Sequence, residues 1–375
     1  MDTRDKFLIM TSGNVHDQPM CTDVSCVLKK LGKVVDYVLD HDLRIAHRVD
    51  DSVVRFTGGE LVIIRRSRGY APMWVRLPIK LRRPAIAFGA DLQMAGAVGV
   101  SDKVVLTQYI GDLDYVETLE DLDRELRWFM KTYRIKDPIL VCDANPAYRS
   151  TWLCHRWAEE FSAEVVSVYH HHAHALSVAA DWGEAGPFVS VAIDGVGYGV
   201  DGMSWGGEVL IIDGAKFSRF GHLTYVPMPG GDLASLYPVR MVISYMSRFM
   251  SNDEVIDYLR KFDLLKGLPN GEVEARVVLK QLGNSIMTSG VGRFLDAISA
   301  LLGLALRRTY EGEPAIVLEA AARGGSLISG FKPTIKHDGD SFVIDTVSMF
   351  KQALETKLSG LGINDIAYTT QYLLG

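Results

Sequence analysis

Four of the ten histidines lie within five positions, at His170, His171, His172 and His174. A helix over this segment places His170 and His174 one turn apart on the same face, where both imidazoles can bind one divalent cation. Ring nitrogens suit iron and zinc alike. Asp194 ends an apolar run, and a carboxylate there is costly unless a cation or hydrogen bonds compensate it. We therefore predict a metal site at His170, His174 and Asp194 in preference to a polar surface turn.

Glycines cluster directly after Asp194, at Gly195, Gly197 and Gly199, and again at Gly206-Gly207. Glycine permits close approach of the backbone, so that main-chain amides can face phosphate oxygens. Between two apolar strands this pattern indicates nucleotide or acyl-phosphate binding, although many such turns only bend the chain. A second turn with an acid, Pro229-Gly230-Gly231-Asp232, fits a surface loop and a ligand contact equally well. The nucleotide candidates here are Gly195, Gly197, Gly207, Gly230 and Gly231.

The N-terminal part offers a different set of polar groups. Thr11, Ser12 and Asn14 follow an apolar run and bring hydroxyl, amide and backbone donors together. Bases outnumber acids between residues 44 and 83, with Arg65 and Arg68 close in sequence. Guanidinium groups neutralise a triphosphate or contact RNA, but a solvated basic face is the more frequent explanation. No P-loop, dinucleotide fingerprint or serine-hydrolase elbow is present in the sequence.

Composition limits the class of protein. The 375 residues are 48% hydrophobic and 23% charged, which is ordinary for a globular chain. A formal net charge of −6 excludes a generally basic nucleic-acid coat and leaves local patches as the only polyanion sites, so RNA is not the expected partner. No apolar stretch is long enough to cross a bilayer, and the N-terminus carries acids where a secretory signal carries bases, so we expect a cytoplasmic protein without a membrane. The four cysteines are expected to be reduced, with a metal shared by Cys21 and Cys26 as the weaker alternative; the other two are Cys142 and Cys154.

Hydrophobic patterning indicates an α/β protein with two strand-rich blocks, each followed by helices. A proline-flanked basic linker over residues 77–84 separates a small first unit from the rest. Two strand-turn-strand blocks with a carboxylate in the turn fit the paired lobes of an actin-like fold. The strands are expected at 34–39, 53–56, 61–64, 85–88, 103–106, 188–193 and 206–212, and the clearest helices at 119–133, 253–262 and 291–306.

In their shared order these motifs resemble the HypF carbamoyltransferase family over nearly the whole chain. Met10 to Asn14, Arg48 to Arg55 and Ile64 to Pro72 are similar to the later part of its YrdC-like adenylation domain. The strings similar to its actin-like transferase domain are Thr107 to Leu113, the four histidines, Asp194 to Glu208, Pro229 to Asp232 and Tyr310 to Gly312.

The resemblance implies a reaction. ATP and carbamoyl phosphate yield carbamoyl-adenylate, and the carbamoyl group passes to the C-terminal cysteine of a HypE-type acceptor in nickel-iron hydrogenase maturation. It implies a divalent metal, iron or zinc, with Mg²⁺ possible beside the nucleotide. By position it assigns the metal to His170, His174 and Asp194, catalysis to Asp201 and Asp232, and nucleotide binding to Thr11, Ser12, Asn14, Arg65, Arg68, Gly195, Gly197, Gly207, Gly230 and Gly231.

The resemblance also implies domain limits. Residues 1–80 match part of a YrdC-like domain and 81–375 match a transferase domain without its final nucleotide and metal motifs. We therefore expect a fragment, a split-gene product or a degenerate member. Two alternatives stay open: an O-carbamoyltransferase acting on a small hydroxylated metabolite, and a catalytically incomplete fragment that binds a maturation partner or RNA.

Overall fold

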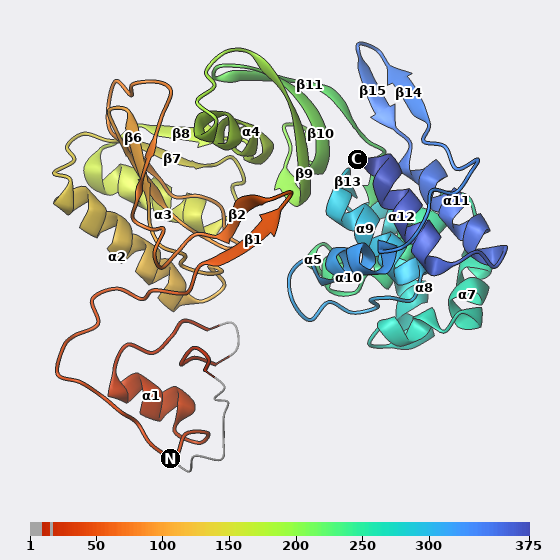
Figure 1. The fold of residues 1–375 in the computed structure, drawn as a ribbon, viewed down its shortest axis with the longest axis horizontal. Coiled ribbons are helices and arrows are strands. Elements are labelled where there is room, and N and C mark those ends of the chain that lie inside the picture. The colour runs from red at the N-terminus through yellow and green to blue at the C-terminus, as the bar shows by residue number, and fades with distance from the viewer. Residues whose placement is uncertain (1–9, 16–17) are drawn as a thin grey trace. The chain divides into compact units, whose positions relative to one another are not determined.

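The computed structural model describes residues 10–15 and 18–375, and the chain divides into two compact units. Unit 1 comprises Met1–Val168 and Val178–Ala185, and unit 2 comprises Tyr169–Ser177 and Gly186–Gly375. Both units combine helices with a β-sheet, as the patterning predicts (Figure 1). Among the helices in the described ranges, none has the length and apolar character needed to span a bilayer.

Unit 1 is built on a six-stranded mixed sheet in the order β3-β6-β5-β4-β7-β8. Strands β4, β7 and β8 run parallel, and β5 turns back antiparallel between β4 and β6. Both strands predicted at 85–88 and 103–106 are present, but they do not pair with each other as predicted, because the short strand Ala97–Val100, which was not predicted, lies between them. The six strands of this sheet are β3 Trp74–Arg76, β4 Ala85–Ala87, β5 Ala97–Val100, β6 Lys103–Leu106, β7 Ile139–Asp143 and β8 Val165–Val168.

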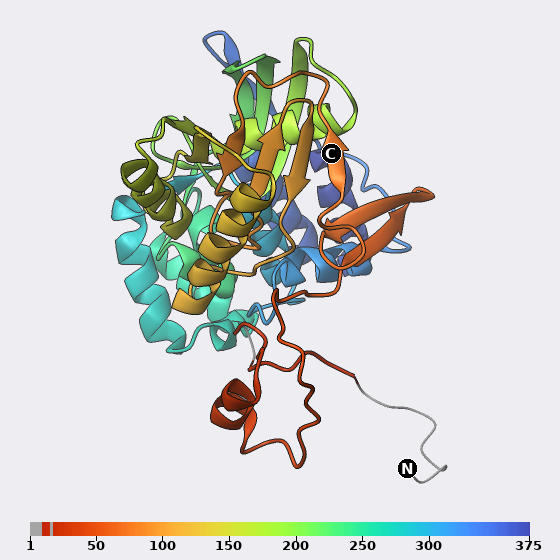
Figure 2. The same ribbon diagram turned by 90° about the vertical axis from the view of Figure 1, so that its left-hand side faces the viewer.

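Two amphipathic helices, α2 (Val116–Thr132) and α3 (Arg149–Phe161), supply the helical layer of unit 1. Apolar residues of α2 recur at helical spacing, and Leu122 and Leu126 are fully buried beside Ile86 of β4. Phe88 and Trp157 pack edge to face with ring centroids 5.2 Å apart. Figure 2 shows the gold α2 running across the strands of this sheet. The helix predicted at 119–133 is confirmed, with its start three residues earlier.

The N-terminal part of unit 1 carries helix α1 (Val24–Leu31) and a β-hairpin of β1 (Val53–Thr57) with β2 (Glu60–Arg65). Both hairpin strands were predicted. The strand predicted at 34–39 is wrong: that segment has no regular secondary structure, and Val34 and Leu39 are largely exposed. An isolated apolar run without a partner strand has no ladder to join, so its alternation alone does not form a strand.

The cysteine prediction is partly wrong. Cys21 and Cys26 form a disulfide five positions apart, with Cα atoms separated by 5.4 Å, instead of holding two reduced thiols or a metal. Asp23 lies between them and caps α1 by accepting a hydrogen bond from the Cys26 amide. This tight turn brings the two side chains within bonding reach, which the spacing alone did not show. Cys142 and Cys154 are free thiols and buried, as expected.

Unit 2 contains a seven-stranded sheet in the order β12-β13-β10-β11-β15-β14, with β9 pairing antiparallel to β10. The long hairpin of β9 and β10 contains both predicted strands of this block. One face of the hairpin packs against Ala175 of α4 (His170–Asp181) through Trp205, Leu210 and Ile212. The strands are β9 Phe188–Tyr198, β10 Ser204–Asp213, β11 Lys216–Leu223, β12 Val226–Pro227, β13 Met287–Thr288, β14 Ile335–Asp338 and β15 Ser341–Ile344.

A helical layer completes unit 2, and its core is centred on α6 (Val239–Met246) and α9 (Val291–Leu301). Tyr245 and Phe294 from these helices are almost fully buried, and Tyr245 stacks on Phe350 at 5.0 Å. The predicted helices at 253–262 and 291–306 are present, but the second ends at Leu301, shortly before Gly303 with φ +78°. The helices are α5 Asp232–Leu236, α6 Val239–Met246, α7 Asn252–Lys261, η1 Leu264–Gly267, α8 Gly271–Gln281, η2 Leu282–Asn284, α9 Val291–Leu301, α10 Glu313–Ala322, α11 Thr346–Leu358 and α12 Ile363–Leu374.

Candidate metal and nucleotide sites

Helix α4 presents two histidines on one face. His170 and His174 are one turn apart, and their Nε2 atoms lie 3.2 Å from each other. Their ring centroids are 4.7 Å apart. This is the i, i+4 arrangement that the sequence predicts, and it aims two imidazole nitrogens at one point in space.

A bulge in β9 brings Asp194 to the same point. Trp205 of β10 pairs with Gly197 and Gly207 pairs with Ile193, so that three residues of β9 stand opposite the single Gly206 of β10. Extra residues in one strand break the ladder locally and redirect a side chain. Without the bulge, the alternation of side chains between the two faces of β9 would continue through Asp194. The bulge is therefore the local feature that directs the carboxylate away from the regular ladder.

The three predicted ligands converge within unit 2. One ligand atom from each of His170, His174 and Asp194 can be chosen so that all lie within 4.8 Å of one another. Asp194 Oδ2 lies 3.3 Å from His170 Nε2 and is buried without a hydrogen-bond partner among the described residues. Two imidazole nitrogens and one carboxylate oxygen without a donor are the ligand set of a divalent cation. The residues present therefore fit a metal.

Asp194 stays ionised in this setting. Burial alone would raise the pKa of its carboxyl, but the neighbouring rings of His170 and His171 outweigh burial and hold the pKa well below its usual range. The Gly195 amide also donates a hydrogen bond of 2.6 Å to Oδ1. A deprotonated carboxylate is the form that binds a cation.

The glycines after Asp194 are required for close packing. A Cβ on Gly197 would lie 2.4 Å from His171 Cε1, and one on Gly207 would lie 2.6 Å from the Ser289 carbonyl oxygen. Gly195 packs against the Arg293 side chain. Gly230 and Gly231 have φ of +83° and +59° in the turn before α5, where glycine is favoured. These contacts explain the glycines structurally, and phosphate binding at them stays a prediction.

The two predicted catalytic aspartates lie in different settings. Asp201 Oδ1 accepts from the Met203 amide and from Trp205 Nε1, while Oδ2 accepts a 2.6 Å hydrogen bond from the Tyr225 hydroxyl. These bonds hold the turn between β9 and β10. Asp232 is exposed in the first turn of α5. The structure thus gives Asp201 a bonding role within its own hairpin, and catalysis by either residue stays a prediction.

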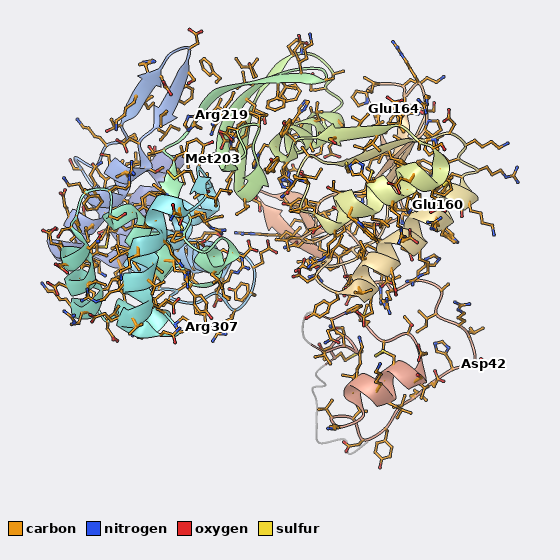
Figure 3. The ribbon with its side chains drawn as sticks, turned by 180° about the vertical axis from the view of Figure 1, so that it is seen from behind. Asp42, Glu160, Glu164, Met203, Arg219 and Arg307 are labelled. Atoms are coloured by element: carbon orange, nitrogen blue, oxygen red, sulfur yellow. A yellow bond between two sulfur atoms is a disulfide. The ribbon has the colours of Figure 1, made fainter. Side chains whose placement is uncertain are left out.

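One buried ion pair in unit 2 was not predicted. Glu208 is 1% exposed and accepts from Arg219 Nε at 2.6 Å and from the Ser289 hydroxyl at 2.5 Å. Arg219, labelled in Figure 3, also lies 4.2 Å from the centre of the Trp205 ring. A glutamate inside the apolar run of β10 was the available signal, because a charge at a buried position needs a partner.

In unit 1 the predicted adenylate residues line one cavity of about 460 Å³. Thr11, Ser12, Asn14 and Arg65 all contribute to its wall, together with the loop around Tyr109. The Arg65 guanidinium lies 4.3 Å from the centre of the Tyr109 ring, which supports the side chain from one side. The apolar run before Met10 lies outside the described residues. The structure therefore brings four of the five predicted adenylate residues of this segment to one place.

Arg68, the fifth, is not part of that wall. Its side chain is exposed and lies 3.5 Å from an Asp51 carboxylate oxygen. The cavity wall is instead held by pairs between the N-terminal segment and α2: Arg48 pairs with Asp121, and His47 Nδ1 lies 2.7 Å from Glu125 Oε1. These pairs explain why Asp121 and Glu125 are buried although they are acidic.

Three family models match the chain. Residues 190–375 match the model described as "Carbamoyltransferase, Kae1-like Domain, second subdomain", and residues 80–181 match "HypF Kae1-like domain". Residues 1–67 match the Sua5, YciO and YrdC model, described as "Telomere recombination". Together they show a YrdC-like segment followed by Kae1-like domains.

Curated relatives and solved structures agree with these models. The chain is 37% identical over 366 residues to a probable carbamoyltransferase HypF of Methanocaldococcus jannaschii, covering 96% of this chain and 46% of that protein. It is 33% identical to carbamoyltransferase HypF2 of Cupriavidus necator, and this match covers 88% of this chain and 40% of that protein. The chain therefore spans less than half the length of these relatives.

Two crystal structures are similar in fold. That of T. kodakarensis HypF is 38% identical with a TM-score of 0.87, and the match covers 97% of this chain and 48% of that one. That of full-length HypF in the phosphate- and nucleotide-bound form is 28% identical with a TM-score of 0.83, and the match covers 97% of this chain and 56% of that one.

Proposed function

Because the chain belongs to the HypF carbamoyltransferase family, we propose that it carries the carbamoyl-transfer site of a HypF-type enzyme. In this reaction ATP, carbamoyl phosphate and water yield carbamoyl-adenylate, with release of pyrophosphate and inorganic phosphate. The C-terminal cysteine thiolate of a HypE-type acceptor then attacks the carbamoyl carbon, a C–S bond forms, and the C–O bond to phosphate breaks with release of AMP. The proposal places the protein in the cytoplasm with its acceptor.

The observation that carries the proposal is the convergence of His170, His174 and Asp194 in unit 2. These residues would hold a divalent metal, iron or zinc, which would polarise the carbamoyl carbonyl or bind the nucleotide phosphate. The chain's own contribution is to fix the direction of each ligand. The α4 helix sets the two rings one turn apart, and the β9 bulge brings the carboxylate close to them.

The adenylate is proposed to bind in the unit 1 cavity. Thr11, Ser12 and Asn14 supply hydroxyl and amide groups, and Arg65 supplies the positive charge that a phosphate needs. Mg²⁺ would accompany the triphosphate. We propose a boundary near residue 80 between the YrdC-like and transferase parts, and we keep Arg68 as an outer contact since its side chain is exposed.

In unit 2 a nucleotide is proposed to contact the turn of Gly230 and Gly231, with Asp232 beside it. The turn is open at Gly231, where a Cβ would meet no atom within 4 Å, whereas a Cβ on Gly230 would lie 2.6 Å from Arg240 Nη1. Gly195, Gly197, Gly207 and Asp201 would then act mainly by shaping the hairpin that holds Asp194, in keeping with their close contacts.

A transfer assay tests the proposal. The chain is combined with the remaining segments of a HypF relative, ATP, carbamoyl phosphate and a HypE-type acceptor, and carbamoylation of the acceptor cysteine is followed by mass spectrometry. We expect a mass increase that requires both small molecules and that is lost in the His170→Ala, His174→Ala double variant. The matched control is His155→Ala, an exposed histidine on α3.

Two results would count against the proposal. One is the absence of acceptor labelling when the intact relative labels it under the same conditions. The other is labelling that survives loss of both histidines, because the metal site would then be unnecessary. Labelling of a small hydroxylated metabolite in place of the acceptor cysteine would select the O-carbamoyltransferase alternative.

A further inference from the structure

His171 is a third histidine of α4 with an unusual environment. Its side chain is 1% exposed, and neither ring nitrogen has an aligned hydrogen bond among the described residues. A buried imidazole without partners costs free energy, because its donor and acceptor lose water without replacement. Such a residue needs an explanation that packing alone does not provide.

The ring points at the carboxylate of the metal site. His171 Nε2 lies 3.2 Å from Asp194 Oδ2, the oxygen that also faces His170 Nε2 at 3.3 Å. The position of the ring is fixed from two sides, since its Cε1 fills the space that a Cβ on Gly197 would occupy and its plane stacks at 26° on Trp205. Helical geometry explains the direction: one residue after His170, the side chain turns about 100° toward the sheet.

From this geometry we propose that His171 is a positioning residue: its Nε2 faces Oδ2 of Asp194 at 3.2 Å, and when a cation occupies the site the ring donates its Nε2–H to Oδ2 and fixes the carboxylate. The inference rests on the proposed metal site. Each carboxylate oxygen has two lone pairs, so Oδ2 can accept this hydrogen bond while it also faces a metal. With the Gly195 amide on Oδ1, both carboxylate oxygens are then held from the protein side.

The geometry argues against His171 as a fourth ligand. The set of side chains whose ligand atoms come together consists of His170, His174 and Asp194. The rings of His171 and His174 are 6.3 Å apart by their centroids, against 4.7 Å for His170 and His174. Both nitrogens of His171 are buried, and Nε2 faces the carboxylate at 3.2 Å. Outer groups of this kind typically change metal affinity about 10- to 100-fold when they are removed.

His172 provides a matched control on the same helix. Its side chain is 6% exposed, and its Nε2 is also buried without a hydrogen-bond partner among the described residues. The difference is direction: the His172 ring lies against Phe217, with centroids 4.9 Å apart. A His172→Phe change therefore has similar burial and size but leaves Asp194 untouched.

The test measures Co²⁺ binding to the full chain by competition with a chelator and by visible absorption. We expect His171→Phe to weaken Co²⁺ binding about 10- to 100-fold, and His172→Phe to bind like the wild type. His171→Gln keeps a donor near the Nε2 position and is expected to restore most of the affinity with an unchanged absorption band. Thermal unfolding of each variant confirms that the chain is folded.

The outcomes separate the two ideas. Binding by the wild type that is lost in His170→Ala supports the metal site, and equal affinity of His171→Phe and wild type would then overturn the role of His171 alone. An absorption band that changes in His171→Gln would also overturn it, because the ring would be a direct ligand. No Co²⁺ binding by the wild type would overturn both.

Discussion

Replacing Gly197 by alanine tests how tightly β9 is packed against the histidine helix. The backbone at Gly197 has no positive φ, so alanine is allowed there and the effect is purely steric. The added Cβ would lie 2.4 Å from His171 Cε1 and 2.9 Å from His170 Cδ2. To reach an ordinary contact of 3.4 Å, the two rings must retreat by about 1.0 Å and about 0.5 Å.

These displacements set the expected magnitude. Overpacking of a close-packed interior costs about 1–3 kcal/mol, and we expect a loss of unfolding free energy in that range. Metal sites tolerate shifts of about 0.2 Å in ligand distance, so a displacement of His170 by more than this is expected to weaken binding. Since outer-contact losses cost about 10- to 100-fold in affinity, at least that reduction is expected for Co²⁺.

Urea unfolding and Co²⁺ competition measure the two effects, with Gly186→Ala as the control. A Cβ on Gly186, in the loop before β9, would meet no atom within 4 Å. A double-mutant cycle with His171→Ala isolates the clash, because removing the ring should recover part of the stability that Gly197→Ala costs. The reasoning is refuted if Gly197→Ala unfolds and binds Co²⁺ like Gly186→Ala, or if the two changes are additive.

Three further predictions concern other contacts. Glu208→Gln breaks the buried ion pair with Arg219 and is expected to lower the free energy of unfolding in urea by about 3–5 kcal/mol. A loss no larger than that caused by a Glu→Gln change at an exposed position would contradict the stabilising role of this pair. At Asp201, burial alone would raise the pKa, but hydrogen bonds, of which that from the Tyr225 hydroxyl is the largest, lower it. Its contribution to stability is therefore present above about pH 4 and lost in stronger acid. Asp201→Asn should destabilise the chain at pH 7 and differ little from the wild type near pH 2, and a pH-independent difference would refute this. Thiol titration of the unfolded, unreduced chain should detect two thiols if the Cys21–Cys26 disulfide is present, and four if it is absent.

Local patterns predicted most of the elements that carry the proposed metal site. The histidine helix follows from spacing alone, and the strands around Asp194 follow from apolar runs. The bulge that directs Asp194 was outside the reach of the pattern. The sequence predicts that the strand ends at residue 193 with a glycine turn after it, whereas β9 continues to Tyr198, and only the pairing with β10 reveals the extra residues. The same limit explains the missed strand Ala97–Val100, whose four residues contain a glycine and have no signal without their neighbours.

His171 was also hidden by local reasoning. At helical spacing it is one residue from His170 and faces another side, so the spacing that predicts the metal ligands assigned no role to His171. Only the approach of Gly197 and Trp205 shows that its ring is enclosed beside Asp194. Burial of a single side chain is a tertiary property, and one sequence without its contacts does not report it.

The glycines of unit 2 show that one residue type can serve either ligand binding or close packing. A glycine favours phosphate binding when its backbone is open to a ligand, and it favours close packing when protein atoms occupy the place of a Cβ. Around Asp194 the second condition holds, since a Cβ on Gly290 would lie 2.3 Å from the Gly195 carbonyl oxygen and one on Gly206 would lie 2.6 Å from that of Asp194. At Gly231 the space is empty. The glycine pattern therefore separates into a packed part around Asp194 and an open position at Gly231, and it is at Gly231 that we propose a phosphate would contact unit 2.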